Sequence, residues 1–109
     1  MLELTVIGNQ GPYAGPGGAC SGYLFSCGST AVLVDSGPGV MSGLQRHIDL
    51  GGLSGIIISH YHPDHCSDFL TMRYAFHHAY SCGQLSGPVP LCVPELGWES
   101  FSRDWVGQQ

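Results

Sequence analysis

Residues 56–65 read Ile56-Ile57-Ile58-Ser59-His60-Tyr61-His62-Pro63-Asp64-His65, and this stretch decides how the chain is interpreted. The branched apolar run predicts a short buried strand. Residues two apart on extended backbone point to the same side, so His60 and His62 are expected to project together. Neutral imidazoles suit a borderline-soft cation such as Zn²⁺. Because Pro63 then turns the chain, Asp64 and His65 reach a neighbouring position, and the stretch predicts the start of a site for one metal ion or two.

The rest of the chain alternates between strand-like and helix-like segments. Apolar and β-branched residues predict strands over residues 2–8, 22–27, 31–35, 55–59 and, interrupted by a proline, 89–93. Helical spacing of apolar residues predicts helices from Pro38 to the Gly51-Gly52 pair, over 67–80 and over 95–106. The last of these would carry an apolar stripe of Trp98, Phe101 and Trp105. Strands that alternate with helices, with polar residues after the C-terminal end of a strand, predict an α/β layered fold.

The composition limits the classes of function. The chain has 109 residues, 43% of them hydrophobic, which fits one globular domain at most. Its net charge is −5 with only three arginines and no lysine, so it cannot build a basic face, and long nucleic acid is not an expected partner. The lack of an 18-residue apolar stretch and of a basic, then apolar, N-terminus predicts neither a membrane span nor a signal peptide. Five cysteines without C-x-x-C spacing favour reduced thiols and a cytoplasmic location.

The histidine motif, the opening residues 2–8 and residues 31–37 resemble the metallo-β-lactamase superfamily in their order and spacing. In detail the chain looks most like the ribonuclease Z-like branch of that family. The resemblance implies an α/β fold, the N-terminal half of an αββα sandwich in which helices cover two packed sheets. It also implies that residues 1–109 form a partial domain whose C-terminal half is absent.

The same resemblance implies metal-binding roles by position. His60 and His62 would bind at site one, and Asp64 and His65 at site two. Asp64 would also act catalytically by positioning the attacking nucleophile or receiving its proton, and Asp35 would support the ligands through hydrogen bonds. The implied cofactor is Zn²⁺, two ions per complete site, with Mn²⁺ or Fe²⁺ as alternatives. The third histidine of site one, the bridging aspartate and the last histidine of site two have no counterpart in the chain, so an incomplete site is expected.

Several residues also have plainer interpretations. Asp35 ends an apolar segment and is equally compatible with a turn or helix-cap role. Cys66 follows the motif directly, and a small buried residue is preferred there over a metal ligand. His77 and His78 are expected to be surface or core residues, because adjacent helical positions do not face each other. Loop 9–20 lacks the Gly-Lys-Ser/Thr and G-x-G-x-x-G patterns of phosphate cradles, and the resemblance implies that it borders the metal site.

The resemblance implies a metal-dependent hydrolase whose dinuclear, zinc-type site activates water. The resemblance favours a phosphodiester bond, and the acidic composition favours a small-molecule or nucleotide-type ester as the substrate. A homodimer of the full-length protein is a further expectation. Two alternatives stay open: a non-catalytic metal-binding or regulatory remnant of the fold, and a hydrolase of carboxylic ester, thioester or lactam bonds. The 109-residue chain alone is predicted to bind zinc weakly and to turn over little or no substrate.

Overall fold

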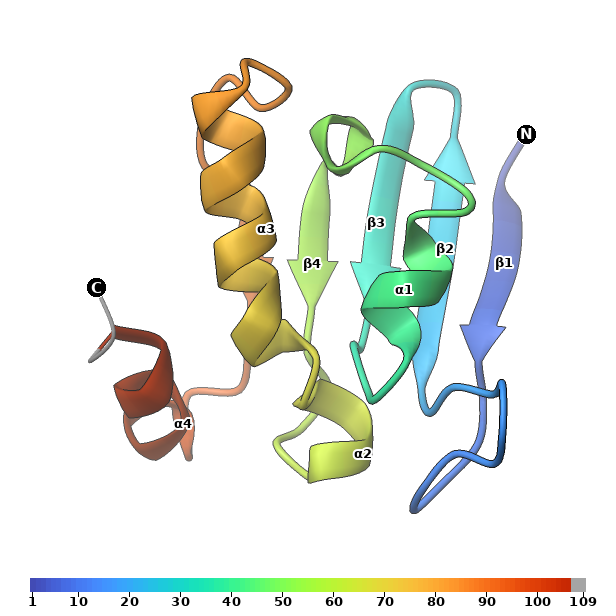
Figure 1. Ribbon diagram of the computed structural model, residues 1–109, viewed down its shortest axis with the longest axis vertical. Helices are drawn as coiled ribbons and strands as arrows, with labels where there is room; N and C mark the ends of the chain where they lie inside the picture. Colours follow the sequence, from blue (N-terminus) through green and yellow to red (C-terminus); the bar gives the residue numbers. More distant parts are fainter. Residues whose placement is uncertain (107–109) are drawn as a thin grey trace.

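The structure, a computed structural model, describes residues 1–106, with side chains through Arg103, as one sheet and its covering helices (Figure 1). The strands are β1 (Glu3–Gly8), β2 (Gly22–Cys27), β3 (Thr30–Val34), β4 (Gly55–Ile57) and β5 (Leu91–Cys92). The helices are α1 (Val40–Leu44), α2 (Pro63–Cys66), α3 (Phe69–Ser81) and α4 (Trp98–Val106), with a 3₁₀ turn at Leu50–Gly52. The predicted α/β class is confirmed. Within residues 1–106 no helix has both the length and the apolar character to cross a membrane.

The sheet follows the order of the chain and changes direction once. β1 pairs with β2, and β2 with β3, in antiparallel fashion, whereas β3–β4 and β4–β5 are parallel. The hairpin between β2 and β3 turns through Gly28, whose φ of 58° lies in the left-handed region that glycine adopts without a steric penalty. Because β3 and β4 are parallel, both end at the same edge of the sheet. Asp35 and Ser59 follow them there and become neighbours.

One face of the sheet carries the core. Leu24, Leu33 and Ile56 are cross-strand neighbours on this face, and each is almost fully buried. Helices α1 and α3 lie over the same face in Figure 1 and add apolar side chains to the core, namely Val40, Leu44, Phe69 and Met72. Since side chains alternate along a strand, the residues between these core positions point to the opposite face.

The structure corrects the bounds of several predicted elements: the strand predicted over 55–59 ends at Ile57, and the helix predicted over 95–106 begins at Trp98. The helix predicted from Pro38 to the Gly51-Gly52 pair ends at Leu44. Beyond it the N–H groups of Arg46 and His47 bond carbonyls three residues back, so the chain tightens into turns instead of continuing as an α-helix. The strand predicted over 89–93 is reduced to Leu91–Cys92, directly after a proline that has no N–H to donate. The side chain of Trp105, the last member of the predicted stripe, lies outside the described residues.

Candidate metal centre

The histidine motif occupies the loop between β4 and α3, at the sheet edge where β3 and β4 end (Figure 1). The backbone is extended at His62, with φ −63° and ψ 139°, and α2 begins at Pro63. Proline is favoured at the first position of a helix because that residue's N–H would have no intrahelical partner. The predicted turn at Pro63 is therefore a short helix, and it carries Asp64 and His65.

The turn that carries Asp64 and His65 is fixed by backbone contacts. The carbonyl of Asp64 accepts a hydrogen bond from the N–H of Ser21 at 3.3 Å, and the carbonyl of His65 accepts one from Ser36 at 2.9 Å. Gly37 makes this approach possible, because a Cβ at that position would lie 2.1 Å from the Asp64 carbonyl oxygen. A side chain at position 37 would therefore prevent the turn that carries Asp64 and His65 from packing against the residues after β3.

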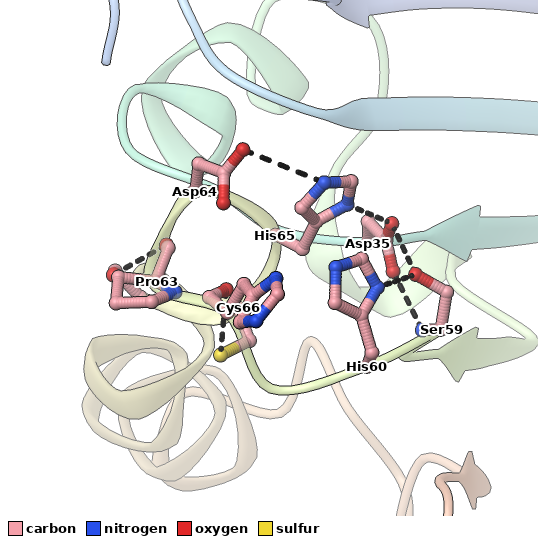
Figure 2. Close-up of polar contacts among 9 residues, drawn as sticks. Asp35, Ser59, His60, Pro63, Asp64, His65 and Cys66 are labelled. Atoms are coloured by element: carbon pink, nitrogen blue, oxygen red, sulfur yellow. Dashed lines mark hydrogen bonds and ion pairs between the residues drawn. The ribbon is translucent and has the colours of Figure 1, made fainter. Parts of the chain in front are cut away.

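Asp35 lies at the centre of the polar contacts around the motif (Figure 2). Its side chain is only 6% exposed. Its Oδ1 accepts the backbone N–H of Ser59 at 2.7 Å, and its Oδ2 accepts the Ser59 hydroxyl at 2.8 Å. The Oδ2 atom also lies 2.8 Å from Nδ1 of His65. Asp35 has a φ of 64°, a left-handed conformation that aspartate tolerates better than most residues, and this directs its carboxylate toward the motif.

These contacts determine which nitrogen of each imidazole is free. An ionised carboxylate only accepts hydrogen bonds, so His65 donates from Nδ1 to Asp35, and Nε2 is the nitrogen left to bind a cation. The Ser59 hydroxyl gives its proton to Asp35, so its oxygen accepts from Nδ1 of His60, 2.9 Å away. Both histidines therefore present Nε2 as the electron-pair donor. Hydrogen bonds of this kind orient metal-binding histidines in proteins.

The predicted ligands come close to one another. The ring centroid of His60 lies 4.8 Å from that of His62 and 4.0 Å from that of His65. His65 lies between Asp35 and Asp64 in Figure 2, and its Nε2 is 3.5 Å from Oδ2 of Asp64. Nitrogen and oxygen donors of one tetrahedral zinc ion lie about 3.4 Å apart, given bond lengths near 2.1 Å, so the Asp64–His65 pair fits a divalent cation in donor type and spacing.

Asp64 and His65 are the two donors of the motif whose spacing fits a divalent cation. Among the residues that the structure describes, no group of three or more His, Cys, Asp or Glu side chains is arranged to hold a metal ion. A catalytic zinc ion normally has three protein ligands and a water molecule. The metal-binding roles of His60, His62, Asp64 and His65 therefore stay predictions, and the described residues supply part of a coordination shell.

The other side of the motif loop rests on α4. Tyr61 donates a hydrogen bond from its hydroxyl to the Pro94 carbonyl at 2.5 Å, and its ring stacks on Phe101 with centroids 5.0 Å apart. Burial raises the pKa of the Tyr61 hydroxyl above its ordinary value, with a smaller contribution from Cys66, so the hydroxyl stays protonated as a donor. Neither Tyr61 nor Ser59 was singled out by the sequence pattern, although each directly adjoins a motif histidine.

Cys66 belongs to the core. It is 2% exposed, packs within the main hydrophobic cluster and directs its thiol toward the carbonyl of His62 at 3.4 Å. Burial, followed by the charges of Asp35 and Asp64, raises the pKa of this thiol to about 11, so the neutral thiol prevails at neutral pH. The preferred interpretation of Cys66 as a small buried residue is confirmed.

Two further predictions concern positions around the motif. Loop 9–20 does reach the motif: a Cβ on Gly11 would lie 2.9 Å from Oδ2 of Asp64. His77 and His78 are exposed on α3, so of the two expected positions, surface or core, they occupy the surface. The described geometry is that of an α/β domain whose imidazoles and carboxylates gather at the C-terminal ends of parallel strands.

The chain belongs to the metallo-β-lactamase superfamily. Residues 15–101 match the model of the family described as the metallo-beta-lactamase superfamily. The chain is 31% identical over 102 residues to a protein of Bacillus subtilis named probable metallo-hydrolase YhfI, a match that covers 94% of this chain and 42% of YhfI. It is 39% identical over 72 residues to ribonuclease Z of Mycobacterium bovis, covering 62% of this chain and 25% of the relative.

Solved structures agree with this assignment. The crystal structure of YhfI from Bacillus subtilis superposes with a TM-score of 0.89 at 32% identity, over 94% of this chain and 42% of that one. Human tRNase Z, short form, has a TM-score of 0.60 at 19% identity, over 86% of this chain and 46% of that one, and shares the fold. The chain thus spans less than half the length of these relatives. Both the family and the resemblance to ribonuclease Z inferred from the sequence are confirmed.

Proposed function

We propose that this chain carries part of the active site of a metal-dependent hydrolase. One observation supports the proposal above the others: Asp35 and Ser59 hold His60 and His65 in the tautomer that leaves Nε2 free. A solvated turn after a strand would have no need for a buried carboxylate that orients one imidazole directly and a second through a serine hydroxyl. Membership of the superfamily and similarity to a protein named metallo-hydrolase support the same conclusion.

The residues of the chain would have distinct roles in metal binding and catalysis. His60, His62, Asp64 and His65 would hold divalent cations, with Zn²⁺ favoured by the mixture of imidazole and carboxylate donors. Cations bound there would supply Lewis acidity and a water molecule of lowered pKa. Asp35 keeps the proton on Nδ1 of His65, so the ring stays oriented during the reaction. Asp64 would position the nucleophile or receive its proton, since its carboxylate lies beside Nε2 of His65 and remains 20% exposed.

We further propose a phosphodiester as the scissile bond. Support comes from the similarity to ribonuclease Z of Mycobacterium bovis. The net charge of −5 and the lack of lysine favour a small or nucleotide-type ester over long RNA, because polynucleotide binding depends on neutralising many phosphates.

Zinc binding by the 109-residue chain tests the site assignment. We expect weak binding in competition with a chromophoric chelator, lost in His65→Ala and Asp64→Asn. His77→Ala is the matched control, because His77 is an exposed histidine on α3 that makes no contact with the motif. Equal affinities for the chain, the two motif variants and the control would contradict the assignment.

Turnover is best tested with the protein translated from the whole reading frame around these residues. A panel of bis(p-nitrophenyl) phosphate, a thioester, a carboxylic ester and a lactam would be assayed with Zn²⁺ or Mn²⁺. We expect hydrolysis of the phosphodiester, abolished by His62→Ala and by Asp64→Asn, and little or none from the 109-residue chain alone. Preference for another member of the panel would refute the phosphodiester proposal while leaving the hydrolase proposal standing.

A second candidate function is a metal-binding or regulatory domain without catalysis. It is favoured by one observation, that the described residues contain no cluster of three potential ligands arranged for a metal ion. The panel distinguishes the two, because a regulatory domain would bind zinc through His65 and Asp64 and hydrolyse none of the four substrates.

A further inference from the structure

A second pair of potential metal ligands lies at the C-terminal end of α3. The Sγ atom of Cys82 is 3.5 Å from Nε2 of His78 and 4.0 Å from Nδ1 of the same ring. The two residues are four positions apart, a spacing that places side chains on one face of a helix. Cys27 and Cys92 are also exposed, but within the described residues neither contacts a histidine. The histidine neighbour therefore distinguishes Cys82 from the other exposed thiols.

The spacing of this pair fits one tetrahedral ion. With a Zn–S bond of about 2.3 Å and a Zn–N bond of about 2.1 Å, the two donor atoms lie about 3.6 Å apart. The separation of Sγ and Nε2 is 3.5 Å. Both side chains are exposed, so the imidazole can rotate to direct its lone pair at a shared ion without displacing a packed neighbour. A thiolate and an imidazole together suit a borderline-soft cation such as Zn²⁺, whereas Mg²⁺ and Ca²⁺ prefer oxygen ligands.

The end of α3 holds the two ligands at this spacing. The N–H of Cys82 donates to the His78 carbonyl at 3.0 Å, and Gly83 follows with a φ of 79°, a left-handed conformation that ends the helix. Backbone hydrogen bonds therefore set the relative position of the two residues. The carbonyl end of a helix carries a partial negative charge, and α3 has 13 residues, so a cation is further favoured at this end.

This pair is separate from the histidine motif. Figure 1 shows α3 running from its start beside α2 to the opposite end of the sheet. A helix of 13 residues is about 20 Å long, so the last turn of α3 lies far from the motif loop that precedes its first turn. Cations bound at the two ends of α3 could not share a ligand.

We propose that His78 and Cys82 bind a borderline-soft divalent cation, with Zn²⁺ preferred, and that water molecules complete its coordination. The thiol releases its proton on binding, and the resulting thiolate coordinates the ion. No group of three or more His, Cys, Asp or Glu side chains among the described residues is arranged to hold an ion, so the protein contributes two ligands here. This inference does not depend on the proposed hydrolase function.

Titration of the chain with Co²⁺ tests the proposal. A thiolate bound to Co²⁺ gives an intense charge-transfer absorption in the near ultraviolet, whereas the imidazoles and carboxylate of the motif give none. We expect this band in the unmodified chain, its displacement by Zn²⁺, and its absence in Cys82→Ser and in His78→Ala. His77→Ala and Cys92→Ser are the matched controls, because each removes an exposed residue of the same type and should keep the band.

Alkylation of the three exposed thiols supplies a second measurement. Zn²⁺ should slow alkylation of Cys82 by about tenfold relative to Cys27 and Cys92, because the thiolate is the nucleophile and coordination occupies it. His78→Ala should remove this protection and His65→Ala should keep it, which separates this site from the motif. Since Zn²⁺ bound here adds to Zn²⁺ bound at the motif, the zinc titrations of the motif variants use Cys82→Ser as their background.

Three outcomes would overturn the proposal. They are the absence of a charge-transfer band with Co²⁺, a band that survives His78→Ala, and equal protection of the three exposed thiols by Zn²⁺. A motif that binds no zinc while Cys82 stays protected would instead refute the proposed function and leave this inference standing.

Discussion

The motif loop is held from two sides, and the two supports differ in kind. On the sheet side a buried carboxylate, Asp35, accepts hydrogen bonds from Ser59 and His65. On the α4 side Tyr61 makes one neutral hydrogen bond to Pro94 and stacks on Phe101. The first support acts on side chains proposed to bind metal, and the second acts on the backbone between His60 and His62.

The difference between the two supports explains which histidines of the motif have a fixed orientation before a metal ion binds. His60 and His65 have defined tautomers because each Nδ1 has a specific acceptor. His62 is exposed. Among the described residues, its ring contacts the ring of His60. The Asp35 side stands at the ends of β3 and β4, whereas the α4 side meets the motif loop through the stacked rings of Tyr61 and Phe101. Four substitutions test this contrast, in order of decreasing effect.

Asp35→Asn should have the largest effect. The asparagine keeps the size of the side chain and tolerates the left-handed backbone, but an NH2 group replaces one carboxylate oxygen and cannot accept from the Ser59 hydroxyl and Nδ1 of His65. We expect a loss of about 3 kcal/mol in unfolding free energy, because a buried charged acceptor is replaced by an NH2 group that faces other donors. Zinc affinity should fall by roughly one to two orders of magnitude, as is usual when a residue that orients ligands is removed. Urea denaturation and zinc titration measure the two effects, and an unchanged stability would show that the carboxylate is dispensable.

Gly37→Ala should come next. Its Cβ would lie 2.1 Å from the Asp64 carbonyl oxygen, so the helical turn that carries Asp64 and His65 must move. We expect a loss of about 2 kcal/mol, within the range for overpacking a filled site. Gly52→Ala is the matched control, because nothing lies within 4 Å of its added Cβ and alanine there should be neutral or slightly stabilising. Thermal unfolding of the two variants should therefore separate clearly, and equal midpoints would contradict the packing argument.

Most of the fold was predictable from the sequence, because local patterns determine it. β2 spans the predicted residues, and β1 and β3 differ from their predicted bounds by one residue at the ends. The α/β class followed from the alternation of strands and helices. What local patterns could not supply was the end of α1 at Leu44, since the apolar spacing continues to Ile48 while the hydrogen bonds change to the tighter turn pattern.

The sequence predicted that the candidate site residues lie near one another, but not the contacts that hold them. The motif predicted that His60, His62, Asp64 and His65 would be neighbours, and their rings and carboxylate do lie close together. The role of Ser59 required the structure, because it depends on β3 and β4 ending side by side. The same holds for Gly37, whose contact with the Asp64 carbonyl joins residues far apart in the sequence. Long-range contacts of this kind leave no periodic trace in a single sequence.

Tyr61→Phe tests the weaker support. The substitution removes the hydrogen bond to the Pro94 carbonyl and keeps the ring that stacks on Phe101. We expect a loss of about 1 kcal/mol, the usual value for one neutral hydrogen bond. Tyr80→Phe, at an exposed position on α3, should change stability by a few tenths of that amount and serves as the control. A loss as large as that of Asp35→Asn would show that the two supports are equivalent, contrary to the contrast drawn above.

Ser59→Ala should have the smallest effect on stability and the most specific effect on the site. The hydroxyl lies between Asp35 and His60, and Asp35 keeps the Ser59 backbone N–H and His65 as donors without it. The unfolding free energy should therefore fall by less than about 1 kcal/mol. The His60 ring, however, loses the acceptor for its Nδ1 proton, and a mixture of tautomers should replace the single one. Nitrogen chemical shifts of His60 and His65 report this directly: His60 should shift toward the mixed form while His65 stays unchanged. If both rings kept their shifts, the orientation of His60 would come from its packing against the other two imidazoles rather than from Ser59.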